Sequence, residues 1–539
     1  MANKFLPVFD KQMWILVQPS PNSHGAGVSM CSDLRNDIFR IPYVYQLATN
    51  AILNRFNIVT KGWHAFANPG APTVAAGSAI AHVPSRGLQG TIAAGSTTTS
   101  ITTSTVITSA FANQFASMGG TGVYGYKIRI IGNRAGGSGK TEEKFIIAST
   151  SGTTPTFILD TPLTFTPGSG DAYEIYAGRV MMLGSGAIAA NSWRAMDVTN
   201  SAFSNLGNTN LPTIGTDSAI LVLDEQFVPY NNFPGEGLIA GEYKYCTNIN
   251  DLFALTATAT AAGTITGQAS GGDSGVVANE YRNFQIRIVE DTTTPTAVGQ
   301  RRIIASHTAG ASPVYTLGAN WTVTPSSTCK FVIEYPNLIL LRTAANTTVY
   351  TYNYGPDTVN NGTNSILTNA WSTTYFGTAP AANAGGNFWM PSCFIQPDVQ
   401  NNSRHSFMFF ARGSGAVVDL LDISGSITGL WTSTIPYETS SGLSSFPNGS
   451  CGTPGFSSLE GRYFYINAYN QSVLNQIFRF DVKNRNLAAY VPTDWIQTGA
   501  AAVGNRFVSY AGFDNFQPND VLLLMVASSN ITQEIIVQA

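Results

Sequence analysis

Short runs rich in Ile, Val, Thr, Phe and Tyr recur along the whole chain, and clusters of Gly, Pro, Ser and Thr separate them. Runs of this length and composition, bounded by turn-forming residues, predict strands rather than helices. Only residues 45–56 (YQLATNAILNRF) have a pattern that fits a helix. The pattern of apolar and polar positions therefore predicts an all-β protein with one short helix.

A duplicated unit stands out within this pattern. Ile128-Arg129-Ile130 recurs as Ile286-Arg287-Ile288, 158 residues later, and Thr164–Pro167 recurs as Thr322–Pro325 at the same offset. Repeats should be sought before motifs, because they reveal the architecture. Each unit is a set of short strands and turns of about 80 residues, which predicts a β-sandwich or β-barrel module. We take both units as small β-sandwich modules.

A second pattern recurs outside the two modules: a strand, a small-residue turn and a second strand, often followed by Asp. It occurs at 179–198, 338–354, 406–423, 462–482 and 521–537, and Trp63, Trp193, Trp371, Trp431 and Trp495 punctuate these segments. Repeated strand pairs with an aromatic residue in each unit are typical of propeller blades. The design resembles kelch repeats, although their paired glycines are missing. We predict a kelch-like β-propeller of about six or seven blades.

The two patterns divide the chain into five parts. Stretches rich in small residues, at 67–100 and 256–275, are expected to lead from the propeller into the two modules. The predicted parts are an N-terminal propeller segment at 1–90, inserted β-sandwich module 1 at 91–178, a propeller segment at 179–255, inserted β-sandwich module 2 at 256–335, and C-terminal propeller blades at 336–539.

Composition narrows the classes of function. Charged residues are only 11% of the chain, against about 25% in average soluble proteins. A neutral, polar surface suits a β-rich protein that contacts copies of itself or other proteins. The net charge of -3 offers no basic surplus for phosphates, so we predict no dedicated nucleic-acid binding. The five widely spaced Cys residues include no C-x-x-C pair, which indicates neither a zinc site nor a disulfide framework.

The N-terminal residues have no signal-peptide pattern, and no run approaches the ~18 apolar residues of a membrane span. We therefore expect synthesis in a cytoplasm, no membrane span and no export by the usual route.

One tetrapeptide suggests a serine protease. Gly272-Asp273-Ser274-Gly275 has the form of the nucleophile loop of trypsin-like enzymes, and His82 lies upstream in the order that this family uses. Such a nucleophile needs a base, an orienting carboxylate and an oxyanion hole. However, Val276 follows where the family has Gly-Pro, and the twin position 114–117 at the offset of 158 lacks the motif. We interpret the tetrapeptide as the lead into module 2.

Two further motifs have a structural and a functional interpretation. Residues 134–141 (RAGGSGKT) resemble a phosphate-binding P-loop, but strands flank them on both sides, which favours a hairpin loop. Phe39-Arg40-Ile41-Pro42 resembles the F-R-I-P motif of sialidases, in which the Arg binds a substrate carboxylate. The repeated boxes of sialidases are absent, so an Arg beside a blade strand is the favoured interpretation.

The remaining candidates are histidines and exposed aromatic residues. The His residues form no local cluster with carboxylates; they are His24, His64, His82, His307 and His405. Tyr463, Phe464 and Tyr465 could form a glycan platform, although aromatic residues on strands are more often core. We predict no catalytic residues, no metal or cofactor sites and no enzyme activity.

The modules carry a family resemblance. Their shared order of Tyr-x-Ile-Arg-Ile, Ile-Ile-Ala-Ser, Thr-x-Thr-Pro and Tyr-x-Ile resembles small β-domains of tailed-bacteriophage virion structural proteins. Gly299–Ile304 (GQRRII) resembles a turn-rich strand that recurs in those domains. Propellers occur in the tail nozzle and hub proteins of short-tailed phages. The resemblance implies a nozzle-, hub- or collar-like part of the tail or neck.

The resemblance also implies partners and a location. The expected partners are copies of the chain in a homo-oligomeric ring and other virion proteins of the tail, adaptor or capsid. The expected location is the virion, assembled in the cytoplasm of a host bacterium. In this picture a rigid propeller carries two modules that project toward neighbours, receptor or solvent.

Two alternatives stay open: a virion protein that binds a host receptor or glycan, and a propeller enzyme that uses Arg40 or Ser274. The sequence leaves open the position in the virion, the ring order and the host.

Overall fold

The computed structural model describes the strands and most of the loops between them. The longer stretches outside the described residues are 1–13, 33–42, 67–73, 117–125, 185–191, 230–242, 246–253, 268–275, 383–387, 398–403, 413–417, 440–450, 455–462, 469–475, 491–505, 512–519 and 526–531, with shorter gaps elsewhere. In several strands only the backbone is described.

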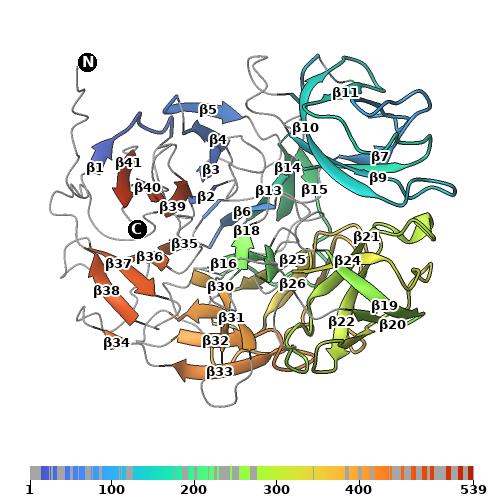
Figure 1. The fold of residues 1–539 in the computed structure, drawn as a ribbon. Coiled ribbons are helices and arrows are strands. Elements are labelled where there is room, and N and C mark those ends of the chain that lie inside the picture. Colours follow the sequence, from blue (N-terminus) through green and yellow to red (C-terminus); the bar gives the residue numbers. More distant parts are fainter. Residues whose placement is uncertain are drawn as a thin grey trace, which may run out of the picture.

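Six antiparallel sheets form the blades of a propeller (Figure 1). Blade 1 contains β2 (Ser29–Ser32), β3 (Tyr43–Ala48), β4 (Ile52–Asn57) and β5 (Gly62–Phe66). Blade 2 contains β6 (Ala79–Val83), β13 (Arg179–Leu183), β14 (Trp193–Asp197) and β15 (Phe203–Asn205). Blade 3 contains β16 (Ala219–Leu223), β25 (Leu338–Arg342), β26 (Tyr350–Asn353) and β29 (Ala370–Ser372).

The other three blades follow in chain order. Blade 4 contains β30 (Phe388–Pro397), β31 (Arg404–Ala411), β32 (Val418–Asp422) and β33 (Leu430–Ile435). Blade 5 contains β35 (Cys451–Pro454), β36 (Tyr463–Ala468), β37 (Gln476–Asp481) and β38 (Asn486–Tyr490), with β34 (Glu438–Thr439) added parallel to β38. Blade 6 contains β39 (Arg506–Ala511), β40 (Asp520–Met525), β41 (Thr532–Val537) and β1 (Trp14–Leu16).

The first strands of successive blades contact one another in a closed ring: β2, β6, β16, β30, β35, β39 and back to β2. Blade 6 takes its outer strand from the other end of the chain, because β1 pairs with β41 through Trp14 and Ile535. Lys61 of blade 1 also binds Glu534 of blade 6 at 2.8 Å. The prediction of an all-β propeller is confirmed, with six blades among the described residues.

Two six-stranded units interrupt the blades. Module 1 contains β7 (Gln89–Thr91), β8 (Ser100–Thr102), β9 (Lys127–Ile131), β10 (Thr141–Ser149), β11 (Thr156–Leu159) and β12 (Ala172–Tyr176). Module 2 contains β19 (Leu255–Ala261), β20 (Thr264–Gly267), β21 (Gln285–Glu290), β22 (Arg301–His307), β23 (Val314–Leu317) and β24 (Lys330–Glu334). Three shorter elements lie near module 2: the pair β17 (Phe227–Pro229) and β18 (Tyr243–Tyr245), the pair β27 (Val359–Asn360) and β28 (Ser365–Ile366), and a 3-10 turn at Pro295–Ala297.

The modules share one topology, and it is a barrel rather than the expected sandwich. In module 2 the order β19-β20-β23-β22-β21-β24 closes on itself. Module 1 has the equivalent order β7-β12-β9-β10-β11-β8, and an isolated bridge between Ile92 and Thr103 joins its two end strands. The sandwich prediction is wrong because β19 is long enough to pair with β24 at one end and with β20 at the other.

Both modules are inserted at the same place in consecutive blades, between the first and second strands. Module 1 lies between β6 and β13, and module 2 lies between β16 and β25, so they lie side by side at one edge of the propeller (Figure 1). Residues 89–100 and 256–267 of the expected linkers belong to the modules, because they contain β7, the start of β8, nearly all of β19, and β20. Only three residues, Tyr335 to Asn337, separate β24 from β25.

The predicted helix at 45–56 is wrong. This segment contains most of β3 and β4, which pair antiparallel from Tyr43–Asn57 to Ala48–Ile52. Every residue of β3 is buried, so the strand lacks the alternation that distinguishes a strand from a helix. The segment contains the second and third strands of blade 1. In each of the other five blades, the second and third strands are one of the five strand pairs that the sequence pattern predicted.

Apolar clusters fill the spaces between neighbouring blades. One cluster joins blades 1 and 2, a second joins blades 2 and 3, and a third joins blades 1 and 6. Module 1 has a largely separate core around Ile128, Ile130 and Phe157. The core of module 2 continues into blades 3 and 4, where it includes Phe376 and Phe410. Module 2 is thus built into the propeller, whereas module 1 is mainly a body of its own.

We expect Trp193 to be a main contact between blades 2 and 3. Its buried ring lies 5.3 Å from that of Tyr352 and 5.1 Å from that of Trp371. Trp193→Ala should destabilise the propeller by about 3 kcal/mol or more, since it leaves a large cavity. Trp193→Phe keeps an aromatic ring there and should cost about 1 kcal/mol. Thermal unfolding of both variants tests the contact, and equal midpoints for the two would contradict it.

Candidate functional site

The two modules meet through charged residues that lie outside their apolar cores. In β9, Ile128 and Ile130 point into the barrel, while Lys127 and Arg129 lie on the opposite side of the strand. Both charged residues are nevertheless fully buried. Exposed strand faces normally keep such residues in water, so their burial requires paired charges around them.

Arg129 lies at the centre of the module 1 cluster. The antiparallel register places Glu143 of β10 and Glu174 of β12 directly opposite it. Its Nε donates to Glu143 at 2.9 Å, and its Nη1 donates to Glu174 at 3.2 Å. Lys127 Nζ lies 2.8 Å from the second oxygen of Glu143, and the guanidinium also lies over the ring of Tyr176. The cluster thus pairs two cations with two carboxylates.

Glu143 is ionised despite its burial. Removal from water favours the neutral acid, but the nearby positive charges of Lys127, Arg129 and Arg287 outweigh this effect and lower the pKa to about 2. Because Arg287 belongs to module 2, the carboxylate interacts electrostatically with both modules. The ion pairs are therefore present throughout the neutral and mildly acidic range.

Module 2 contains a matching ion pair at β21, the strand equivalent to β9. Arg287 binds Glu334 through two nearly parallel hydrogen bonds of 3.0 and 3.1 Å, and Gln285 donates to the same carboxylate at 2.9 Å. All three side chains are buried. Two-pronged pairs of this kind are among the stronger hydrogen bonds in proteins, and they fix orientation as well as charge.

Arg301 of β22 connects three parts of the molecule. Its Nη2 donates to the two oxygens of Glu174 in module 1 at 3.2 and 3.1 Å. Its Nη1 lies 3.7 Å from Asp357, in the loop that follows β26 of blade 3. One buried guanidinium thus bridges module 1, module 2 and the propeller. We call Lys127, Arg129, Glu143, Glu174, Arg287, Arg301, Glu334 and Asp357 the junction cluster.

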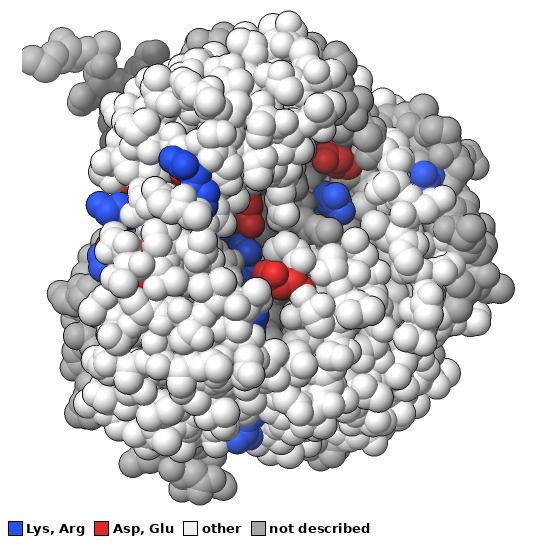
Figure 2. Space-filling model, turned by 90° about the vertical axis from the view of Figure 1, so that its right-hand side faces the viewer, with Lys and Arg blue, Asp and Glu red and all other residues white. Residues whose placement is uncertain are grey.

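The backbone supports the same contact. Asp291 N–H of module 2 donates to the carbonyl of Gly139 at 2.7 Å, and Lys140 and Glu290 form a bridge between the two modules. Gly139 has a φ of 68°, and a Cβ there would overlap the backbone of Asp291. Figure 2 looks onto this edge of the molecule: most of the surface is uncharged, and charged residues gather at the hollow between the two lobes.

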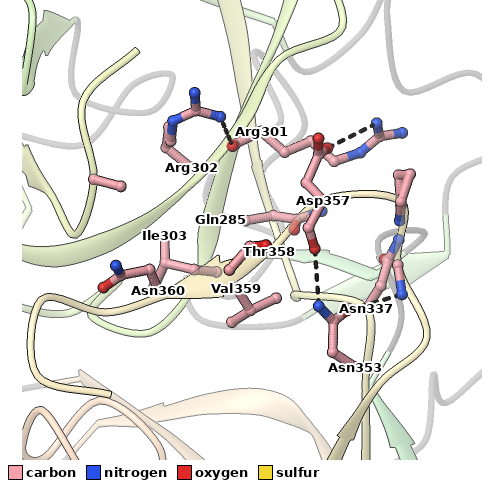
Figure 3. A pocket seen from close by; sticks show the side chains of 13 residues that line it. Gln285, Arg301, Arg302, Ile303, Asn337, Asn353, Asp357, Thr358, Val359 and Asn360 are labelled. Atoms are coloured by element: carbon pink, nitrogen blue, oxygen red, sulfur yellow. Dashed lines mark hydrogen bonds and ion pairs between the residues drawn. The ribbon is translucent and has the colours of Figure 1, made fainter. Parts of the chain in front are cut away.

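A pocket of about 350 Å³, including its open mouth, lies beside Arg301, between β22 and the loop 353–360 of blade 3 (Figure 3). Arg301 and Arg302 point to opposite sides of β22, and the carboxylate of Asp357 faces Arg301. Neutral amides supply most of the remaining polar groups, from Gln285, Asn337, Asn353 and Asn360. Among the lining residues the one carboxylate is Asp357, which is paired with Arg301.

The junction cluster and the amides of the pocket hold the two modules and the loop 353–360 of blade 3 together. The charges of the junction cluster face partners of opposite sign, and the amides of the pocket brace its loop: Asn353 donates to the Asp357 carbonyl at 2.8 Å and accepts from Gly355 N–H at 2.9 Å. Breaking such contacts would leave buried charges without compensation, which is strongly unfavourable. The junction therefore fixes the orientation of the modules.

Several motifs considered from the sequence are placed differently by the structure. Gly272-Asp273-Ser274-Gly275 and Phe39-Arg40-Ile41-Pro42 lie outside the described residues. Because β19 and β20 precede it, the tetrapeptide falls inside module 2 rather than before it. Of residues 134–141, all but Thr141, the first residue of β10, lie in the loop that connects antiparallel strands β9 and β10. The N–H groups of Arg134, Gly137 and Gly139 bind other groups of the module.

The histidines and aromatic residues are also dispersed. His82 is buried in β6 and stacks on Tyr45 at 6.1 Å, whereas His64 lies on β5 and His307 on β22. His24 and the side chain of His405 lie outside the described residues. Phe464 and Tyr465 are buried, so they do not form an exposed glycan platform, and the side chain of Tyr463 lies outside the described residues.

The described part of the chain contains no group of three His, Cys, Asp or Glu residues arranged to hold a metal ion. Within that part, no helix is long and apolar enough to cross a membrane.

The sequence pattern did not predict the junction cluster, although three of its members, Arg129, Arg287 and Arg301, lie in the repeated motifs. Arg129 and Arg287 are the repeated Arg of the Ile-Arg-Ile match. At the same offset of 158, however, Glu143 is replaced by Arg301. This reversal of charge between twin positions, beside an unchanged Arg, is the available signal that the two copies complement each other.

Comparisons with known proteins assign no family. No protein-family model matches the chain, and no curated protein sequence matches it. A solved structure of the C-terminal WD40 domain of Sif2 is 9% identical, with 97% of this chain and 99% of that chain covered and a TM-score of 0.27. An ulvan lyase of polysaccharide lyase family PL25 is 8% identical, with 98% and 96% covered and a TM-score of 0.27.

A mutant of the NanB sialidase from Streptococcus pneumoniae is 8% identical, with 95% of this chain and 82% of that chain covered and a TM-score of 0.18. With TM-scores this low, the propeller assignment rests on the order and pairing of the strands, and no activity is carried over from these proteins.

We predict that Glu174→Gln weakens the junction far more than a change in an exposed pair. The substitution removes a charge that Arg129 and Arg301 share, and it should cost about 3 kcal/mol. The control is Glu290→Gln, whose partner Lys330 is 44% exposed, and its cost should stay below about 1 kcal/mol. Calorimetric unfolding measures both changes; similar losses in both variants would contradict a structural role for the junction.

Proposed function

We propose that this chain is a structural component of a tailed-bacteriophage virion, in the tail or neck, where it acts as an assembly scaffold through symmetric protein–protein contacts. The observation that carries the proposal is the junction cluster, together with the module sequences that resemble phage virion domains. Two barrels joined to each other by buried ion pairs, with the core of module 2 continuing into blades 3 and 4, form a rigid body of defined shape. Rigid bodies of defined shape suit symmetric assemblies, in which every copy must present the same surface.

The surface composition supports the same role. Only 11% of the residues are charged, and several of those are buried in the junction cluster. Large surfaces of neutral polar residues can be covered by neighbouring subunits without the cost of removing charges from water. The proposed partners are copies of this chain in a ring and other proteins of the tail, adaptor or capsid.

The role we propose is not enzymatic. His82 would have to act as the base in the serine-hydrolase alternative, but it is 3% exposed and stacked on Tyr45 between blades 1 and 2. A general base must reach the proton that it takes, directly or through one water molecule. This environment supports a packing role for His82.

The direct test has two parts. Light scattering of the purified chain should show a homo-oligomer. Mass spectrometry of virus particles, purified from a culture that produces the chain, should detect it in the particle fraction. A gene that lies next to portal, capsid or tail genes would add support. A monomeric chain that is absent from particles would overturn the proposal. Glycan-array binding by the same particles would instead favour the receptor-binding alternative.

The enzyme alternative has its own test. Wild-type protein, Ser274→Ala and Arg40→Ala are incubated with peptide, ester and sialoside substrates. We expect no turnover in any of the three and unchanged association with particles. Turnover by the wild type that either substitution abolishes would show that the corresponding motif is an active site, contrary to the proposal.

A further inference from the structure

Two turns, at 112–116 between β8 and β9 and at 276–283 between β20 and β21, have the same backbone hydrogen bonds but different side chains. In module 1, Asn113 N–H donates to the Ser149 carbonyl at 2.7 Å, and Ser149 N–H donates back to the Asn113 side chain at 3.2 Å. In module 2, Asn279 and His307 exchange the same two bonds at 3.2 and 2.9 Å. Both Asn residues have a positive φ, of 61° and 64°. The two turns are therefore structural equivalents.

The equivalent turns differ in the side-chain group that accepts a hydrogen bond from the backbone N–H two residues after the Asn. In module 1, Phe115 N–H donates to the hydroxyl of Ser149 at 3.3 Å. In module 2, Tyr281 N–H donates to Nε2 of His307 at 2.9 Å. A hydroxyl keeps its accepting lone pairs at any physiological pH, whereas an imidazole nitrogen loses its lone pair when it is protonated. The same position is thus insensitive to pH in one module and titratable in the other.

The hydrogen bonds of His307 fix its neutral form. Nε2 accepts from Tyr281, and Nδ1 lies 2.9 Å from the carbonyl of Thr308, to which it donates. A proton on Nε2 would point at the Tyr281 N–H, and both groups would then be donors. The ring is 4% exposed and lies between the rings of Tyr281 and Tyr315, at 5.7 and 5.2 Å. Water cannot readily take over the lost contact.

The charged groups around the ring give it no carboxylate partner among the contacts described. Burial lowers the pKa of His307 to about 4, and the positive charge of Arg282 acts in the same direction, although the Thr308 carbonyl opposes them. Glu280, in the same turn, accepts from Val277 N–H at 3.1 Å. Asp422 of blade 4 interacts with Arg282.

The turn that His307 holds also attaches module 2 to the propeller. Asn283 lies at its end, and its Nδ2 donates to the carbonyls of Ile423 and Ser426 at 2.6 and 3.0 Å. Those carbonyls belong to the loop between β32 and β33 of blade 4. The turn at 276–283 and the contact between module 2 and blade 4 therefore share Asn283.

We propose that His307 makes module 2 an acid-sensitive element: its protonation releases the turn at 276–283 and loosens the attachment of module 2 to blade 4, while module 1 is unaffected. This inference is independent of the proposed function. The direction of the pH dependence follows from the linkage between protonation and folding. A histidine that is harder to protonate in the folded state stabilises it fully above its ordinary pKa of about 6.5. That stabilisation is lost as the pH falls from 6.5 toward 4.

Hydrogen exchange of the full-length protein between pH 7 and pH 4, corrected for the intrinsic pH dependence of exchange, tests the proposal. Protection of the turn at 276–283 should fall about 100-fold over this range relative to the equivalent turn at 112–116. Exchange in the blade 4 loop at 423–429 should rise with it. Flat protection in the turn, or a loss there without any change at 423–429, would overturn the proposal.

The matched variant is His307→Ser, which installs the hydroxyl that module 1 uses. It should remove the pH dependence of the turn even if the smaller side chain lowers stability at every pH. If this variant does not fold, His307→Gln offers an amide oxygen that can accept from Tyr281 and that does not titrate. Ser149→Ala in module 1 should weaken its own turn equally at pH 7 and pH 4. An acid-induced loss that persists in the His307 variant would show that another group is responsible.

Discussion

The architecture depends on one constraint: whatever is inserted between two paired strands of a blade must begin and end at nearly the same point. The first and second strands of blades 2 and 3 are antiparallel neighbours, so the chain must leave and return within a few ångströms. Both barrels meet this condition because their first and last strands pair with each other, β7 with β12 and β19 with β24. A closed barrel also leaves no edge strand unpaired.

The two barrels emerge from consecutive blades and their outer faces meet, so the composition of these faces decides the kind of contact. Apolar faces would have formed a simple hydrophobic contact. Here the faces carry buried Arg and Glu residues, which are tolerated because each lies against opposite charge. Such an interface depends on orientation more strongly than an apolar one, since small displacements remove hydrogen bonds at once. The interface therefore selects one arrangement of the two barrels.

The sequence predicted the strands of the blades and modules better than it predicted the contacts between these parts. Five of the strand pairs at the second and third blade positions could be recognised, because each is two apolar runs around a turn. The sixth pair, β3 and β4, contains the segment 45–56 that the pattern predicts as a helix, since the wholly buried β3 lacks alternation. The repeat revealed the modules, but it could not show that β19 closes a barrel, that Arg301 reaches Glu174, or that Asp357 lies beside it. Those contacts join residues far apart in the chain, and the charge reversal between Glu143 and Arg301 does not say which residues pair across that distance.

The pairing of β1 with β41 has a consequence for the time course of folding. Trp14 and Ile535 are partners, so β1 cannot join blade 6 until synthesis has passed the residues of β41. Closing so long a loop is entropically costly and slow, whereas each barrel closes over a much shorter stretch of chain, as in the pairings of Gln89 with Glu174 and of Leu255 with Phe331. During synthesis the modules can be complete while the ring is still open. In that interval β1 and the growing blade 6 present unpaired edges, and crowding many nascent copies together favours exchange of this strand between chains.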